Sequence, residues 1–444
     1  MTRPTIWRVP SNICAAMSEA SPDRTVAPPL QSVPAIALPP MTSAVLASGA
    51  ELKIYDKSPT DVVQLSVVRE GGLAEIADPA AAQLFGATLR EGSAHYSAGE
   101  IAETLDFNGA WLNASVLPHH HLLKFYALRK RLPEVLPVVN DILRAPAFAP
   151  EAVERHRESQ AGKLEVALRK VKFLADRSSQ LAAYGAGHPL VRDVTPDAIR
   201  AVRRDDLLAV AGAWREAPAT IYLSGKVTDS VAALVESAFG DLPCGRRSLI
   251  RAVPLSPAPP GSTRRTALDG ASQCAVAMTL PAVSRSHPDY LMLHTAVAAL
   301  GGYFGSRLMS VVREEKGYTY GISAGLLGQI DGAFISIGAE CDPRFVGALI
   351  EEVRTQMLRL AEEPPAGDEL VRLRQALASG LLEVLETPFT IADYHSTMQT
   401  QGIADGYFDS RVRLLRSLEP RHIAAMAERY LRPELLTVSI AGQV

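Results

Sequence analysis

A short apolar segment that ends near a glycine occurs twice in this chain, and the spacing of its copies strongly constrains the fold. Residues 220–227 read TIYLSGKV, and residues 437–444 read TVSIAGQV. Each copy follows a segment with helical character, residues 199–207 in the first half and 418–430 in the second. Internal similarity at this spacing predicts two homologous domains of about 180–220 residues.

Proline marks the boundaries of these domains. The first 44 residues are dense in Pro and Ser and show no helical period, so we expect an extension there. Proline is dense again between residues 254 and 260, which predicts a stiff linker. The predicted organisation is an extension (1–44), a first domain (45–245), a linker (246–263) and a second domain (264–444).

Strand-like segments precede the long helical patterns in each half. Alternating patterns predict strands over residues 50–55, 62–69, 122–128 and 335–339, and 3.6-residue periods predict helices over 150–182, 345–360 and 368–386. Neighbouring strands follow one another without an obligatory helical crossover. The fold class is therefore predicted as α+β, with a mainly antiparallel sheet and helices on one face in each domain.

Charge and composition exclude several classes of function. The formal net charge of −3 gives no basic surface for nucleic acid, and no apolar run reaches the length of a membrane span. The four cysteines are scattered and predict neither a disulfide framework nor a metal knuckle. Without a recognisable secretory signal we expect a soluble cytoplasmic protein, or a periplasmic one if the start site is misassigned.

Residues 300–321 combine a glycine-rich turn, a short amphipathic helix and a Gly-Tyr-x-Tyr-Gly corner. Gly317 is expected to end the helix, and the chain then continues extended through Tyr320 and Ile322 with a period of two. Arg313 on the helix and Tyr320 on the strand can converge. Together they offer a guanidinium and a phenol to a peptide carbonyl or an oxyanion. The alternative is a surface Arg and a half-buried sheet Tyr.

The same stretch resembles the second half of the pitrilysin/insulinase metallopeptidases, the inverzincins, and most closely their processing-peptidase branch. The pattern runs from Leu300 through Gly301 and Gly302 to Arg313 and Tyr320. The resemblance covers nearly the whole chain and implies paired α/β-roll domains. It also implies that Arg313 and Tyr320 bind substrate across a chamber from zinc, and it makes Gly301 and Gly302 candidate substrate-binding residues. The longer glycine-rich insertion of the mitochondrial noncatalytic subunit is absent.

The family's H-x-x-E-H zinc motif is degenerate in the first half. A helix is expected to begin with Asp78 as its N-cap and to end near Gly92. By resemblance, the motif falls on Gln83, Gly86 and Ala87, and the third ligand falls at or beside Lys163. None of these side chains is a suitable zinc ligand or general base. We therefore expect neither metal nor cofactor in this chain, and zinc in a partner.

The remaining histidines include one cluster. His119 and His121 would share a strand face and make a two-His metal site if a carboxylate joined them; the alternative is a solvated or interface strand end. His188 is interpreted as structural. Asn113 and Ala114 match a family turn that leads into the strand over the substrate, so they are candidate substrate-binding residues at a β-augmentation edge, or part of an ordinary turn.

These features predict the noncatalytic subunit of a heterodimeric zinc metalloendopeptidase. Its partners would be a homologous H-x-x-E-H subunit and a peptide substrate, with no nucleic acid and no membrane. The alternative is a structural or assembly subunit, or a peptide-binding protein, with no proteolytic role. A scaffold alone has no need for both Arg313 and Tyr320 at their spacing.

Overall fold

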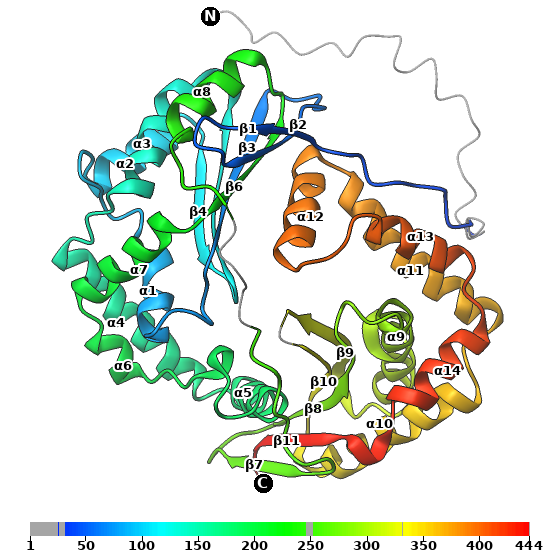
Figure 1. Cartoon of the computed structure of the whole chain (residues 1–444). Coiled ribbons are helices and arrows are strands. Elements are labelled where there is room, and N and C mark those ends of the chain that lie inside the picture. The colour runs from blue at the N-terminus through cyan, green and yellow to red at the C-terminus, as the bar shows by residue number, and fades with distance from the viewer. Residues whose placement is uncertain (1–24, 26–31, 246–251, 331, 444) are drawn as a thin grey trace, which may run out of the picture. The chain divides into compact units, whose positions relative to one another are not determined.

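The computed structural model describes residues 25, 32–245, 252–330 and 332–443. Two β-sheets organise the unit formed by residues 33–444, and Figure 1 shows them with their helices. The predicted α+β class and the mainly antiparallel pairing are confirmed. Among the described residues, no helix combines the length and apolar character that a membrane span requires.

The first sheet has six strands in the order β1-β2-β6-β3-β5-β4. They are β1 (Thr42–Val45), β2 (Glu51–Tyr55), β3 (Val62–Glu70), β4 (Trp111–Val116), β5 (His120–Leu128) and β6 (Ala219–Gly225). Strands β2 and β6 run parallel, and the other pairs are antiparallel. Strand β4 forms one edge of the sheet.

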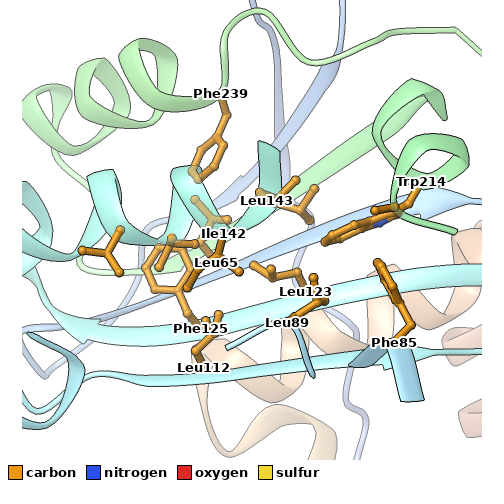
Figure 2. Close-up of a cluster of buried hydrophobic side chains, with 14 of the residues drawn as sticks. Leu65, Phe85, Leu89, Leu112, Leu123, Phe125, Ile142, Leu143, Trp214 and Phe239 are labelled. Carbon is orange, nitrogen blue, oxygen red and sulfur yellow. The ribbon is translucent and has the colours of Figure 1, made fainter. Parts of the chain in front are cut away.

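Helices of the first half gather on one side of this sheet (Figure 1). They are α1 (Pro79–Thr88), α2 (Ala98–Phe107), α3 (Leu132–Arg144), α4 (Pro150–Ala167), α6 (Pro196–Ala201), α7 (Arg204–Glu216) and α8 (Asp229–Phe239). Their apolar faces and the alternate residues of the strands form one core. Figure 2 shows this cluster, with Leu65 and Phe125 from the strands beside Trp214 and Phe239 from the helices.

The second sheet repeats the topology of the first. Its order is β7-β11-β8-β10-β9, with β7 (Thr263–Ala267), β8 (Cys274–Ala282), β9 (Thr319–Gln329), β10 (Gly332–Cys341) and β11 (Thr437–Gly442). The two copies of the repeated segment form β6 and β11. Each lies between a parallel strand (β2 or β7) and an antiparallel one (β3 or β8). Equivalent places in two sheets are what a duplicated unit requires.

The second half has its own helices. They are α9 (Tyr290–Val297), α10 (Val346–Glu362), α11 (Gly367–Leu385), α12 (Pro388–Thr400), α13 (Tyr407–Arg416) and α14 (Pro420–Tyr430), together with π-helical segments over Ala298–Gly302 and Met309–Glu315. The buried residues of β8, β10 and β11 pack with α9, α10 and α14 in a second core. Predicted helices 345–360 and 368–386 correspond to α10 and α11.

Each sheet also meets a helix from the other half, on the face opposite its own core. The expected helix over residues 150–182 is two helices, and the second, α5 (Val171–Tyr184), lies on β8 and β11. Ala175 packs there against Ala275 and Ala441. Because β8 alternates, Ala275 faces α5 while Val276 faces the second core. Helix α12 contacts β6 and β2 in the same manner.

Polar side chains join α12 to the first sheet. Asp393 of α12 accepts hydrogen bonds from Lys124 at 2.6 Å and from Gln64 at 3.0 Å. Tyr222 of β6 donates to Gln399, and Phe389 packs edge-on against Tyr126 with 5.4 Å between ring centroids. The two halves are therefore connected by specific contacts as well as by the chain between them.

Parts of the predicted extension and linker make defined contacts with the rest of the unit. Residues 42–44 belong to β1, and Val33, Ile36 and Leu38 pack against a cluster of α11 and α13 residues. Residues 1–24 and 26–31 of the predicted extension lie outside the described residues, as do residues 246–251 of the predicted linker. Within the rest of the linker, Ser256 donates its amide to Tyr184 at the end of α5.

Candidate functional site

Arg313 lies on the π-helical segment η4 (Met309–Glu315). Segments of this kind are rare and occur often at functional sites. Arg307 fixes the start of the segment: its Nε donates to Glu369 at 2.8 Å, and its Nη1 donates to the carbonyl of Arg359 at 3.1 Å. Gly317 follows with a φ of +64°, so the chain turns sharply before β9 begins. The predicted helix stop at Gly317 is confirmed.

A β-bulge turns Tyr320 away from the second core. Ala339 of β10 pairs with Ile322, and Cys341 pairs with Thr319, so β9 has one more residue than β10 across this interval. The extra residue reverses the alternation of side chains. Ile322 is 4% exposed and Tyr320 is 93% exposed. The expected period-two continuation from Tyr320 to Ile322 is therefore wrong, and so is the alternative of a half-buried Tyr.

Arg313 and Tyr320 do converge. The Cζ atom of Arg313 lies 5.7 Å from the ring centroid of Tyr320 and 4.8 Å from that of Phe304. Both distances are within the range of cation–π attraction. An ion pair with Glu314, at 3.6 Å, adds little because exposed pairs of this kind are weak. The arrangement presents a guanidinium edge and a phenol to an incoming polar group.

Phe304 was not among the residues that the sequence indicated. It is 66% exposed and follows the Gly301-Gly302 turn. A large aromatic residue between a glycine pair and Gly305, just before the helix that carries Arg313, was the available signal. Local patterns give no direction for such a side chain, however, so its contact with Arg313 appears only in the fold.

Gly301 and Gly302 lie close to Ala324 of β9. A Cβ atom on Gly301 would lie 2.7 Å from the backbone nitrogen and from the Cβ of Ala324 on β9. A Cβ on Gly302 would lie 3.0 Å from the Cβ of Ala298. Gly301 is buried and Gly302 is exposed. The absence of side chains therefore lets the π-helical segment η3 (Ala298–Gly302) approach β9 closely, and a substrate-binding role remains a prediction.

Helix α1, where the metal motif would lie, begins as the sequence predicts. The Asp78 carboxylate accepts the amide of Ala80 at 2.8 Å, and Pro79 occupies the first helical position. Gln83 is exposed, and Gly86 and Ala87 are half-buried. These three residues offer one neutral amide and no imidazole or carboxylate.

The backbone at Gly86 also conflicts with a catalytic glutamate. A Cβ atom at this position would lie 2.8 Å from the carbonyl oxygen of Ala114 and 3.5 Å from its carbon. Helix α1 therefore lies closer to β4 than a residue with a side chain permits. A general base at position 86 would require α1 to move away from the strand.

The residues present do not fit a zinc ion. Lys163 on α4 is exposed and cationic, so it adds repulsion instead of a third ligand. Among the described residues, no group of three or more His, Cys, Asp or Glu side chains is placed to hold a metal. Catalysis through a metal ion of the family type is therefore not assigned to this chain.

The histidine cluster is buried, contrary to the expectation of a solvated or interface strand end. His119, His120 and His121 are 3%, 8% and 4% exposed. The His121 ring lies 5.8 Å from Phe85 and 5.9 Å from Trp214, within the first core. Burial, with a smaller contribution from the charge of His119, lowers the pKa of His120 to about 4. The cluster is thus part of the packing around β5.

His188 has a structural role, as the sequence interpretation held. Its Nε2 lies 2.9 Å from the carbonyl oxygen of Val253, and its Nδ1 accepts the amide of Leu190. The ring also packs 4.8 Å from that of Tyr184. These contacts join the end of α5 to the segment around Val253.

Asn113 and Ala114 lie on the edge strand β4. Asn113 is exposed, and its amide donates to Ser115 at 3.1 Å. The neighbouring carbonyl of Leu112 accepts a hydrogen bond from Arg90 at 3.3 Å. One carbonyl of this edge is therefore already bonded, by Arg90 after the end of α1. A peptide that pairs with Asn113 and Ala114 remains a prediction.

A cavity of about 1570 Å³ lies elsewhere in the molecule. Its lining includes His120, Tyr222, Arg285 and Gln399, but neither Arg313 nor Tyr320. Its lining combines acidic, basic and apolar side chains, so it does not indicate one class of ligand. The Arg313–Tyr320 pair is the better candidate site because its two donors converge.

Two family models match the chain. The model described as insulinase (peptidase family M16) matches residues 57–183, and the model described as peptidase M16 inactive domain matches residues 202–377. A Schizosaccharomyces pombe protein described as a probable mitochondrial-processing peptidase subunit beta is 26% identical over 223 residues, which are 47% of this chain and 49% of that protein. The match thus spans about half the length of that relative.

A Mycobacterium tuberculosis protein described as an uncharacterized zinc protease is 27% identical over 304 residues, 65% of this chain and 67% of that protein. The fold is similar to a peptidase M16 inactive domain from Pseudomonas fluorescens (TM-score 0.80, 20% identity, 91% of this chain and 98% of that one). It is also similar to a protease from Helicobacter pylori (TM-score 0.76, 17% identity, 91% and 100%). The chain therefore belongs to the M16 family of peptidases.

Proposed function

We propose that this chain is the noncatalytic subunit of a heterodimeric zinc peptidase. The observation that carries the proposal is a contrast between the two halves. In the second half a half-buried Arg313 converges with an exposed Tyr320, whereas Gln83, Gly86 and Ala87 of the first half supply no metal ligand. A homologous H-x-x-E-H subunit would supply what the first half lacks. The domains proposed for this role are residues 45–245 and 264–444.

In this role, Arg313 and Tyr320 bind the substrate in the partner's catalytic chamber. The phenol and the guanidinium N–H groups donate to the carbonyl of the peptide bond that is cleaved. They hold it in place and stabilise the negative charge that develops on its oxygen. The high exposure of Tyr320 supports this role, since an exposed phenol can reach a peptide without any movement of the core.

The test is the rate of peptide cleavage by the reconstituted pair. Removing one such donor typically lowers kcat by about 10²–10³-fold. We expect this loss for Tyr320→Phe in a complex with the zinc-bearing homologue. Tyr430→Phe provides a matched control, because its hydroxyl donates to Asp289 within the chain. A Tyr320→Phe complex that keeps the wild-type kcat would refute the role.

A second candidate is a structural or assembly subunit. A chain in Complex III2 from Candida albicans has a similar fold (TM-score 0.70, 13% identity, 90% of this chain and 95% of that one). This likeness concerns the fold alone. The assembly role predicts that Arg313→Ala and Tyr320→Phe leave the complex and its function unchanged, so the same variants separate the two candidates.

A further inference from the structure

We infer that Thr319 and Phe304 are positioning residues, which aim Tyr320 and Arg313 at a common point. The kinetic consequence of this inference rests on the proposed function, but its structural consequence does not. Thr319 lies on β9 and stabilises the β-bulge there. Phe304 lies in the turn before η4 and restrains the guanidinium of Arg313.

Thr319 forms the hydrogen bonds that shape the bulge. Its Oγ1 lies 2.6 Å from the carbonyl oxygen of Glu340 on β10 and 2.9 Å from that of Gly321, and it accepts the amide of Gly321 at 3.1 Å. The side chain is 8% exposed. A single buried hydroxyl thus bonds both strands at the position where their registers differ.

The bulge decides where the Tyr320 phenol points. Without the extra residue, Tyr320 would lie on the same face as Ile322, which is in the second core. With it, Tyr320 is almost fully exposed and lies beside Arg313. Bulges commonly re-aim a side chain next to a functional site. Thr319 is therefore required for the direction of Tyr320, although it does not reach a substrate.

Phe304 restrains Arg313 without occupying its donors. The backbone carbonyl of Tyr303 accepts the amide of Ser306 at 3.1 Å, and this turn presents Phe304 to the guanidinium. A cation–π contact uses the charge of the guanidinium and the face of the ring, so it consumes no N–H donor. Gly305 permits the turn, because a Cβ there would lie 3.0 Å from the ring of Tyr303.

The structural arm of the test uses the isolated chain. Nuclear magnetic resonance of the Nε–Hε group of Arg313, assigned with Arg313→Lys, reports the aromatic rings beside it. We expect Thr319→Val and Phe304→Ala to move this resonance toward its position in an unstructured peptide. The conservative variants Thr319→Ser and Phe304→Tyr should retain the wild-type position. A resonance that is unchanged in both Thr319→Val and Phe304→Ala overturns the inference.

The kinetic arm uses the complex with the zinc-bearing homologue. Misplacement of a catalytic group by about 1 Å can cost about 10²-fold in rate, so Thr319→Val should lower kcat by about tenfold or more, with little change in KM. Phe304→Ala should lower it by about two- to fivefold, as expected for one exposed cation–π contact. Thr319→Ser and Phe304→Tyr should restore most of the rate.

The two arms separate the inference from the proposed function. If Tyr320→Phe and Thr319→Val both keep the wild-type kcat while the Arg313 resonance moves, the positioning is supported and the catalytic role fails. If Tyr320→Phe loses activity while Thr319→Val and Phe304→Ala keep the resonance and the rate, the positioning inference is wrong. Because Phe304 is exposed, its variants test the inference even if Thr319→Val fails to fold.

Discussion

Replacing Gly86 by alanine tests whether α1 packs against β4 too closely for a side chain at this position. The added Cβ would lie 2.8 Å from the carbonyl oxygen of Ala114, well inside normal contact distance. Overpacking of this kind costs about 1–3 kcal/mol. Replacing glycine by alanine inside a helix gains up to about 1 kcal/mol, so the two effects oppose each other.

Gly162 on α4 offers a matched control. A Cβ at this position meets no atom within 4 Å, so Gly162→Ala receives the helical gain without the overpacking. The free energies of unfolding of the two variants should therefore differ by about 1–3 kcal/mol, with Gly86→Ala the less stable. Urea unfolding followed by circular dichroism measures both. If the two variants are stabilised equally, the close approach of α1 to β4 is refuted.

Further predictions concern the contact between the halves and the buried histidines. Asp393→Ala should lower the free energy of unfolding by about 1–3 kcal/mol, because it removes a part-buried bond to Lys124. Asp176→Ala breaks an exposed ion pair and should lower it by about 0.5 kcal/mol or less. Urea unfolding of the two variants makes the comparison. Burial lowers the pKa of His120 and of His294 to about 4, below the unfolded value of about 6.5, so the unfolded state alone binds protons between these values. The free energy of unfolding should therefore keep its full value above pH 6.5 and decline as the pH falls toward 4, by up to about 2 kcal/mol for each histidine at pH 5. His120→Gln or His294→Gln should reduce this pH dependence when urea unfolding is compared at pH 7.5 and pH 5.

Much of the fold could be predicted because the strands and long helices carry clear local periods. Strand β2 lies within the predicted strand 50–55, and α10 and α11 lie within about two residues of their predicted ends. The repeated segments of β6 and β11 indicated the duplication. Local periodicity also gave the start of α1 at Asp78 and the turn at Gly317, since both depend on neighbours in sequence.

The crossing helices could not be predicted in this way. Helix α5 contacts the second sheet through small residues such as Ala175, and α12 contacts the first sheet through Asp393 and Gln399. Hydrophobic patterns assign such residues to solvent or leave them neutral. Their partners lie in the other half of the chain, so no local window contains the interaction.

The candidate site was only partly predictable for the same reason. The sequence indicated that Arg313 and Tyr320 converge, but the exposure of Tyr320 depends on a bulge whose partner residues, Ala339 and Cys341, lie on another strand. The burial of His119 to His121 likewise depends on distant residues such as Trp214. A run of three histidines suggests a polar strand end, but the tertiary packing around β5 buries all three side chains.

The central claim is that this chain completes a peptidase that it cannot form alone. The most direct measurement follows cleavage of a quenched fluorescent peptide by this chain, by its H-x-x-E-H homologue and by their mixture, with the zinc content of each sample. We expect this chain alone to be metal-free and inactive, and the mixture to cleave with activity that depends on Arg313 and Tyr320. Zinc-dependent cleavage by this chain alone would contradict the account, as would a mixture no more active than the homologue.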